Sequence, residues 1–218
     1  LIIKVGNVID IFEDLKIDFD IKGIYSHQET GDFLSYKRDQ KVKRWSKENN
    51  IQWKEYLQFA VFRGNINRNE WSKLFRKHYE KDIIENYSNL KLLELKGNKI
   101  PSDDFFKFKK DICKGRLKGG RKEGIKRLNY FFKNKIDLYG TDISSPEKSF
   151  NSCSRLSPYI SWGCLSMREI LKKASSCNSR NTKMFSSRLT WHCHFIQKLE
   201  TEPELEFNEY HPYFKDLR

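Results

Sequence analysis

The sequence predicts an α/β segment followed by an all-α segment. Over the first sixty residues, short apolar runs alternate with amphipathic stretches, a pattern typical of strands alternating with helices. After about residue 63 the strand pattern stops, and helical patterns recur to the C-terminus. We therefore predict an α/β region at 1–62, a linker with helices at 63–118 and a helical region at 119–218.

The α/β region should contain three strands and two helices. The predicted strands are 1–5, 21–25 and 51–57, and the predicted helices are 8–15 and 33–49. Strands separated by helices pair in parallel through right-handed crossovers, so we expect a small parallel sheet. Because such a sheet is covered on both faces, we expect residues before position 1 to supply its missing edge, which would make the sequence a fragment.

The middle of the chain reads as helices that lead into a basic connection. Residues 69–79 and 87–95 have helical patterns, and a Pro-Ser break follows them. Residues 107–127 are rich in lysine and arginine and are interrupted by four glycines. This stretch lacks the Lys-Ser/Thr pair that ends a phosphate-binding loop, and no buried strand precedes it. We therefore expect a solvated linker.

The strongest candidate anion site lies between residues 152 and 163. Ser154, Arg155 and Ser157 directly precede Pro158. Ser157 has the side chain of an N-cap, and Pro158 suits the first position of a helix. The free N–H groups of such a helix start, together with the hydroxyls, would bind a phosphate. The alternative is a capped helix that binds nothing.

Residues 182–199 form the best-patterned helix. One stripe is predicted to face the core, and it consists of Phe185, Leu189, His192, Ile196 and Leu199. A second stripe alternates cations with aromatic rings, and it consists of Arg188, Trp191, Phe195 and Lys198. Such a face can stack on exposed bases while its cations hold phosphates. The alternative is a core edge with snorkelling cations.

A metal site is not expected on this helix. His192, Cys193 and His194 are successive residues, and successive helical positions point about 100° apart, so these side chains cannot converge on one ion. The five cysteines are odd in number and form no CxxC pair, which argues against a disulfide framework and favours a reducing compartment. We expect a cytoplasmic protein.

The composition favours a polyanionic partner. The 218 residues include 42 Lys and Arg against 29 Asp and Glu, which gives a net charge of +13. A basic excess of this size is typical of nucleic-acid-binding proteins, although lysine-rich surfaces also arise from solubility alone. No apolar run approaches the roughly twenty residues that cross a membrane, so we expect no membrane association.

Four further passages are spread across nearly the whole chain. They are Tyr25–Gly31 with Arg38-Asp39 and Trp53-Lys54-Glu55; Gly119-Gly120-Arg121 with Leu128, Phe132 and Tyr139; Ser154-Arg155-Leu156-Ser157-Pro158-Tyr159 with Gly163-Cys164-Leu165-Ser166; and Arg188–His192. In this order they resemble four parts of the cryptochrome/DNA photolyase flavoprotein family: its N-terminal α/β domain, the opening of its flavin domain, the segment that wraps the FAD diphosphate, and the helix that touches DNA.

The resemblance implies a remnant of a Rossmann-like parallel-sheet domain, a linker, and the first part of a helical FAD-binding domain. It implies FAD as cofactor, with a second, antenna chromophore of unspecified identity. The residues it implies for binding FAD are Tyr139, Cys153, Ser154, Arg155, Leu156 and Ser157, of which Ser154 to Ser157 would hold the diphosphate. Those it implies on the DNA and lesion side are Arg188, Trp191, His192, Phe195 and Lys198.

Three of these positions depart from the family's pattern. Cys153 stands where many members have threonine, Arg188 where many repair members have glutamate, and His192 where they have arginine. The resemblance also indicates that both ends of the family's chain are missing, including the residues that tune the flavin. We therefore assign no catalytic residue, and we expect the 218-residue chain by itself to bind flavin weakly or not at all.

The implied activity is a carbon–carbon lyase reaction, the FAD-dependent, blue-light-driven repair of pyrimidine dimers by a photolyase-type electron transfer. The implied partner is DNA containing such dimers, and we expect a monomer. One alternative is a cryptochrome-like flavin photoreceptor without repair activity. Another is a basic nucleic-acid-binding module without a cofactor.

Overall fold

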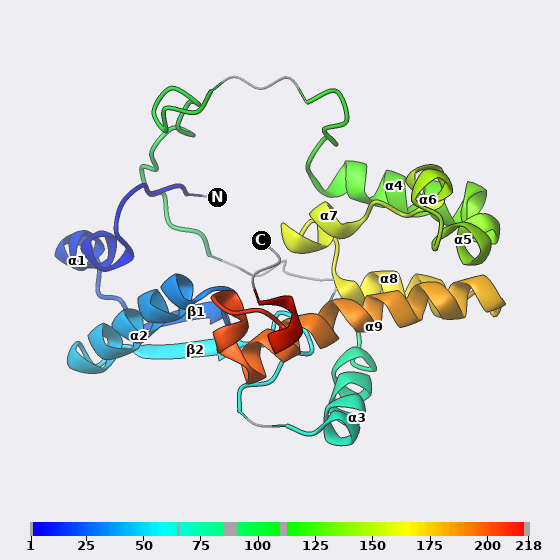
Figure 1. Cartoon of the computed structure of the whole chain (residues 1–218). Coiled ribbons are helices and arrows are strands. Elements are labelled where there is room, and N and C mark those ends of the chain that lie inside the picture. The colour runs from blue at the N-terminus through cyan, green and yellow to red at the C-terminus, as the bar shows by residue number, and fades with distance from the viewer. Residues whose placement is uncertain (1, 65, 85–90, 110–112, 216–218) are drawn as a thin grey trace. The chain divides into compact units, whose positions relative to one another are not determined.

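The computed structural model of the chain describes residues 2–64, 66–84, 91–109 and 113–215 (Figure 1). The chain forms two compact units. The first unit comprises Leu1–Gln58 and Glu85–Arg116, and the second comprises Phe59–Ile84 and Leu117–Arg218. Residues 63–84, which the sequence assigns to a linker, thus lie in the second unit.

The first unit contains the predicted parallel strand pair. Its elements in chain order are α1 (Val8–Asp18), β1 (Gly23–His27), α2 (Phe33–Glu48) and β2 (Gln52–Tyr56). The strands pair in parallel, from Gly23 opposite Gln52 to His27 opposite Tyr56. The prediction of helix, strand, helix and strand over residues 8–57 is therefore confirmed, with β1 beginning two residues later than expected.

The strand predicted at 1–5 is wrong over residues 2–5, and residue 1 lies outside the described residues. Residues 2–5 have no strand conformation, and Ile2 and Val5 are about two-fifths exposed. The backbone of this run forms hydrogen bonds with a distant residue instead. The Asn98 N–H donates to the Ile3 carbonyl at 2.7 Å, and the Val5 N–H donates to the Asn98 side-chain oxygen at 3.3 Å. An apolar run becomes a strand only beside another strand, and no described strand lies next to this run.

The second unit is helical. Its elements are α3 (Arg68–Tyr79), α4 (Arg121–Asn134), α5 (Ile136–Asp142), α6 (Pro146–Ser152), α7 (Ser157–Ser161), α8 (Met167–Ser175), α9 (Arg180–Thr201), η1 (Pro203–Glu206) and η2 (Pro212–Phe214). The helix predicted at 69–79 is confirmed as α3. The helix predicted at 87–95 is wrong over 91–95, which have no helical conformation, and its first four residues lie outside the described residues.

Side-chain caps explain where most of these helices begin. In each case a side-chain oxygen accepts a hydrogen bond from a backbone N–H of the first turn. These residues are Asn7, Asp32, Asn67, Ser145, Ser166 and Ser179. Gly120 precedes α4 differently, because its φ of 97° lies in the region that favours glycine.

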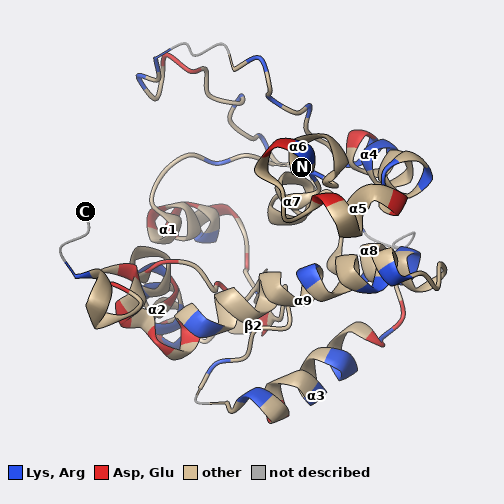
Figure 2. Ribbon diagram, turned by 45° about the vertical axis from the view of Figure 1, so that its right-hand side comes forward, with Lys and Arg blue, Asp and Glu red and all other residues tan. Residues whose placement is uncertain are grey.

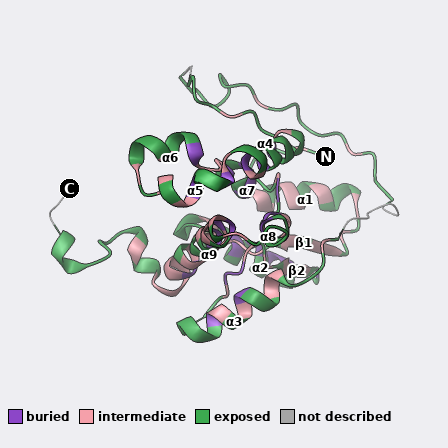
Figure 3. Ribbon diagram, turned by 90° about the vertical axis from the view of Figure 1, so that its right-hand side faces the viewer, coloured by how far each residue is buried: buried purple, intermediate pink, exposed green. Residues whose placement is uncertain are grey.

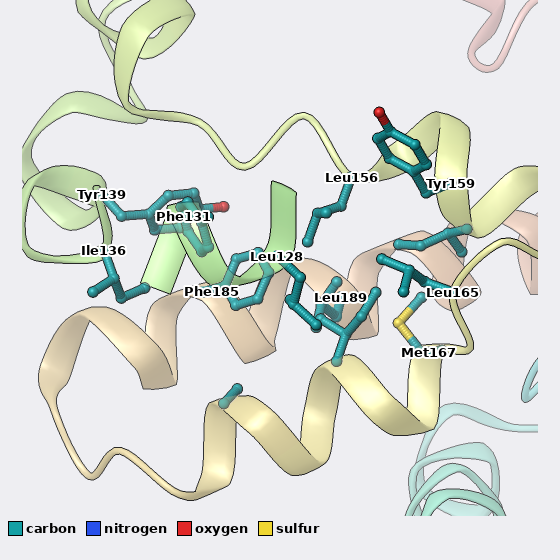
Figure 4. Close-up of a cluster of buried hydrophobic side chains, with 13 residues drawn as sticks. Leu128, Phe131, Ile136, Tyr139, Leu156, Tyr159, Leu165, Met167, Phe185 and Leu189 are labelled. Atoms are coloured by element: carbon teal, nitrogen blue, oxygen red, sulfur yellow. The ribbon is translucent and has the colours of Figure 1, made fainter. Parts of the chain in front are cut away.

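A cluster of thirteen buried side chains forms the main core of the second unit (Figure 4). Figure 3 shows the buried residues of this unit concentrated along α4, α7, α8 and α9. The rings of Phe131 and Phe185 lie 4.8 Å apart, and Tyr139 packs edge-on against both. A smaller cluster of Ala60, Trp71, Phe75 and Cys193 joins α3 to α9.

The core-facing stripe predicted on α9 is correct only in its first half. The buried residues of α9 are Thr182, Phe185, Leu189, Cys193 and Gln197, whereas His192, Ile196 and Leu199 are only partly buried. Gln197 is buried because its amide exchanges two hydrogen bonds with the Phe62 backbone, at 2.7 and 2.9 Å. A polar residue that satisfies another segment's backbone cannot be recognised from hydrophobic periodicity.

Candidate functional site

The candidate anion segment connects α6 to α7. Cys153 follows the last residue of α6, and Ser157 is the first residue of α7. Between them Leu156 is 1% exposed and points into the main core, as Figure 4 shows. Ser154 and Arg155 are half-buried and Ser157 is exposed. One apolar side chain thus anchors the segment while polar groups on both sides of it remain accessible.

Ser157 is not the N-cap of α7, contrary to the sequence-based prediction. The N-cap is Leu156, whose φ of −89° and ψ of −13° are already helical, and Pro158 occupies the second helical position. The Ser154 hydroxyl accepts a hydrogen bond from the Leu156 N–H at 3.4 Å. The helix α7 therefore begins at Ser157, one residue earlier than predicted. Because α7 has only five residues, its dipole is short, so binding of an anion here would depend on side chains.

Arg155 has an unusual backbone conformation. Its φ is 53°, in the left-handed region that a residue with a Cβ rarely adopts. The guanidinium lies 5.2 Å from the centre of the Phe150 ring, a cation–π contact between α6 and the segment. Backbone outliers of this kind are concentrated at functional sites, where the surrounding structure enforces them. Nothing in the sequence indicated the role of Phe150.

Tyr139 is buried in the core, but its hydroxyl makes no hydrogen bond to any described residue. Burial raises the pKa of this hydroxyl, the positive charge of Arg188 lowers it, and Cys153 raises it. The hydroxyl therefore stays protonated at neutral pH and is available as a donor. The Tyr139 ring also packs edge-on against Phe185 of α9 at 5.4 Å between centres, so α5 and α9 lie side by side here.

The second predicted stripe of α9 forms an exposed row over part of its length. The Arg188 guanidinium lies 3.9 Å from the centre of the Trp191 ring. The Trp191 and Phe195 rings meet edge to face, with their centres 6.2 Å apart. Trp191 is 45% exposed and Phe195 is 62% exposed. We call Arg188, Trp191 and Phe195 the aromatic row.

Two residues predicted with this row have other contacts. His192 packs its ring against Phe59, with centres 4.8 Å apart, and burial lowers the pKa of its imidazole. Lys198 pairs with Glu202 one turn further along the helix and lies over the Tyr210 ring. The structure therefore brings together three of the five residues predicted on this face.

An ion pair that the sequence did not indicate joins the start of α4 to the start of α8. The two terminal nitrogens of Arg121 donate to the Glu169 carboxylate at 2.6 and 3.1 Å. Glu169 also forms a capping box with Ser166, the N-cap of α8. Hydrogen bonds from Arg121 lower the pKa of Glu169.

Two kinds of feature are absent from the residues that the structure describes. No group of three or more His, Cys, Asp or Glu side chains there could hold a metal ion. No helix there is both long and apolar enough to cross a membrane. The five cysteines are free thiols.

The chain is similar in fold to about half of each of two photolyases of known structure. The structure is similar to a bacterial class III photolyase from Agrobacterium tumefaciens, with a TM-score of 0.73 and 15% identity over 98% of this chain and 48% of that one. It is also similar to an archaeal photolyase from Sulfolobus tokodaii with two FAD molecules, with a TM-score of 0.61 and 20% identity over 100% of this chain and 47% of that one.

The likeness confirms, in the fold, the resemblance that the sequence motifs indicate. At these identities it shows the fold alone, and the chain spans about half the length of the photolyases that it matches. No family model matches the sequence. A search of curated proteins finds no match either.

Proposed function

We propose that this chain is part of a photolyase/cryptochrome-type flavoprotein, with FAD as its cofactor. The observation that carries the proposal is that Leu156 and Tyr139 belong to one core with Phe185 of α9, the helix that carries the aromatic row. Both neighbours are photolyases, and one of them is described with two FAD molecules, which supports FAD in particular.

The residues present fit an anion such as the FAD diphosphate. Neither the Tyr139 hydroxyl nor the Ser157 hydroxyl has a hydrogen-bond partner among the described residues, and both can donate. Arg155 adds a guanidinium on the segment that Leu156 anchors. A phosphate accepts hydrogen bonds from such donors and interacts favourably with the positive charge of Arg155.

In the proposed complex, Tyr139 and Ser157 donate hydrogen bonds to phosphate oxygens, and Arg155 contributes positive charge. Cys153 supplies a thiol, a weaker donor than the threonine hydroxyl that it replaces in the resemblance. Leu156 sets the position of the segment by its burial rather than by contact with the cofactor. The bound flavin would supply the light-driven electron transfer that splits a pyrimidine dimer.

The aromatic row suits a DNA partner. An exposed tryptophan ring stacks on a base that has left the duplex, and Arg188, already over that ring, adds charge next to it. The net charge of +13 provides the attraction for the phosphate backbone. We propose that the complete protein repairs pyrimidine dimers as a cytoplasmic monomer that also carries an antenna chromophore.

The second candidate is a cryptochrome-like photoreceptor. Arg188 and His192 favour it, because they replace the glutamate and arginine found at these positions in many repair members. His192 also packs against Phe59, so it does not extend the aromatic row. A receptor would keep the candidate anion segment at 153–157, here called the cofactor segment, and would lose the contacts specific to the lesion.

One assay separates these functions. The full-length protein that contains this chain is purified, its visible absorption is recorded, and the reduced form is illuminated with blue light in the presence of dimer-containing DNA. A flavin absorption band with restored pyrimidines is the expected result. A flavin band without repair would indicate the photoreceptor, and the absence of a flavin band would indicate a basic nucleic-acid-binding module.

A further inference from the structure

The second unit holds a cavity of about 440 Å³ between α3 and α8. It is separate from the cofactor segment and from the aromatic row, and the proposed flavin function does not use it. Its lining includes two aromatic residues and four basic ones: Phe75, Tyr79, Arg76, Lys81, Arg168 and Lys172. Cavities of roughly 300–1,000 Å³ are the usual size for sites that bind small molecules.

The lining has an excess of positive charge. Arg76, Lys81, Arg168 and Lys172 contribute cations, and only Glu80 and Asp82 contribute carboxylates. None of these six side chains forms an ion pair with another described residue. Figure 2 shows basic residues on both α3 and α8. A concave surface lined by one sign of charge concentrates ligands of the opposite sign.

Arg168 is held rigidly at this cavity. Its two terminal nitrogens donate to the backbone carbonyls of Asp82 and His78, both at 3.1 Å. Because both acceptors are neutral, the guanidinium charge is not compensated by a carboxylate. Burial and the charges of Arg168 and Lys81 lower the pKa of the His78 imidazole to about 4, which is consistent with a positive potential here.

The remaining wall is apolar and partly aromatic. The Phe75 and Tyr79 rings meet edge to face with their centres 4.8 Å apart, and Leu171 lies on the α8 side. A ring with an attached phosphate matches both parts of the lining, because the ring packs against the apolar wall while the phosphate meets the cations. We propose that this cavity binds a small phosphate ester the size of a mononucleotide.

The test uses isothermal titration calorimetry of the 218-residue chain with AMP, inorganic phosphate and adenosine as probes. AMP should bind most tightly, inorganic phosphate more weakly, and adenosine without measurable heat. Lys172→Ala should weaken AMP binding about tenfold through loss of a charge-assisted contact. Lys173→Ala, the neighbouring exposed lysine on the same helix, does not line the cavity and should leave the affinity unchanged.

A second matched pair lies on the other side of the cavity. Lys81→Ala should weaken AMP binding about as much as Lys172→Ala does. Lys77→Ala, an exposed lysine of α3 outside the lining, should have no effect. Because each test variant and its control lose the same charge, a general effect of net charge would appear equally in both.

Three results would overturn the proposal. The first is no AMP binding by the unmodified chain. The second is an equal loss of AMP affinity in each cavity variant and its control. That result would mean that AMP is attracted by diffuse surface charge, as a single-stranded nucleic acid or any other polyanion would be. The third is a loss on Arg155→Ala but not on Lys172→Ala, which would place AMP at the cofactor segment. None of these depends on whether the complete protein binds flavin.

Discussion

Tyr139 and Tyr159 are equally buried, each 4% exposed, yet only the Tyr159 hydroxyl has a hydrogen-bond partner among the described residues. It donates to the Lys118 carbonyl at 2.7 Å. Both rings belong to the main core of the second unit. The Tyr139 hydroxyl is therefore free to donate to a ligand, whereas the Tyr159 hydroxyl already serves the backbone of its own unit.

The two tyrosines provide a matched test of this explanation. Tyr139→Phe should change the free energy of unfolding by less than about 0.5 kcal/mol, because no internal hydrogen bond is lost, but should weaken flavin binding by the complete protein about tenfold. Tyr159→Phe should cost about 1 kcal/mol of stability and leave flavin binding unchanged. Chemical denaturation and flavin fluorescence titration measure the two quantities. Equal losses of flavin affinity in both variants would refute the assignment of Tyr139.

Leu156 and Ser157 are neighbours with opposite expected effects. Leu156→Ala should destabilise the protein by about 2–5 kcal/mol, because it removes a fully buried side chain from the core. Ser157→Ala should leave stability nearly unchanged, because this side chain is exposed, while reducing flavin retention. Thermal unfolding and the flavin content of the purified protein check both. A Ser157→Ala protein that retains its full flavin content would exclude this hydroxyl from the cofactor site.

Trp191 should contribute to DNA binding through stacking. Trp191→Ala should weaken the affinity of the complete protein for dimer-containing DNA about tenfold, because base–aromatic stacking contributes about 1–3 kcal/mol per base. Trp162 is the control: it is 85% exposed, follows α7 and is not part of the aromatic row. Fluorescence anisotropy with labelled duplex measures the affinities. If Trp162→Ala weakens binding equally, the row has no special role.

The affinity for DNA should also fall steeply with salt. Contacts between lysine or arginine and phosphates release counterions, so the logarithm of the binding constant decreases linearly with the logarithm of the salt concentration. The same anisotropy assay, repeated between about 50 and 200 mM salt, gives the slope. Arg188→Gln should make this slope shallower by about one unit. A flat salt dependence would rule out the electrostatic part of the proposed DNA interaction.

The Arg121–Glu169 pair predicts a specific pH dependence of stability. Because the folded pKa of Glu169 is lowered, its stabilisation is present above the ordinary value of 4.5 and is lost as the pH falls through the lower folded value. Glu169→Gln keeps an acceptor for the capping box but removes the charge. It should cost about 0.5–1 kcal/mol at pH 7 and progressively less below pH 4.5. Urea unfolding at a series of pH values tests this, and a cost that is independent of pH would contradict it.

Local sequence patterns predicted an element correctly where residues close together in the sequence stabilise it. The helices α1, α2 and α3 follow from amphipathic spacing and polar caps, and the capping box of Ser166 and Glu169 from two residues three apart. The run at 1–5 has the composition of a strand, but strand pairing depends on a distant partner. Among the described residues, the backbone hydrogen bonds of this run are made with Asn98.

The sequence by itself predicted α3 and α9 of the second unit, the two helices and the parallel strand pair of the first, and the motifs at 152–163 and 188–198. Only the tertiary structure decided which side chains of those motifs are anchors and which are donors. Leu156 and Ser157 are adjacent in one motif, but one is buried and the other exposed. Similarly, only folding brings Arg188 of α9 close to Tyr139 of α5. The physical reason is that burial and electrostatic proximity depend on contacts between distant segments, which short-range periodicity does not encode.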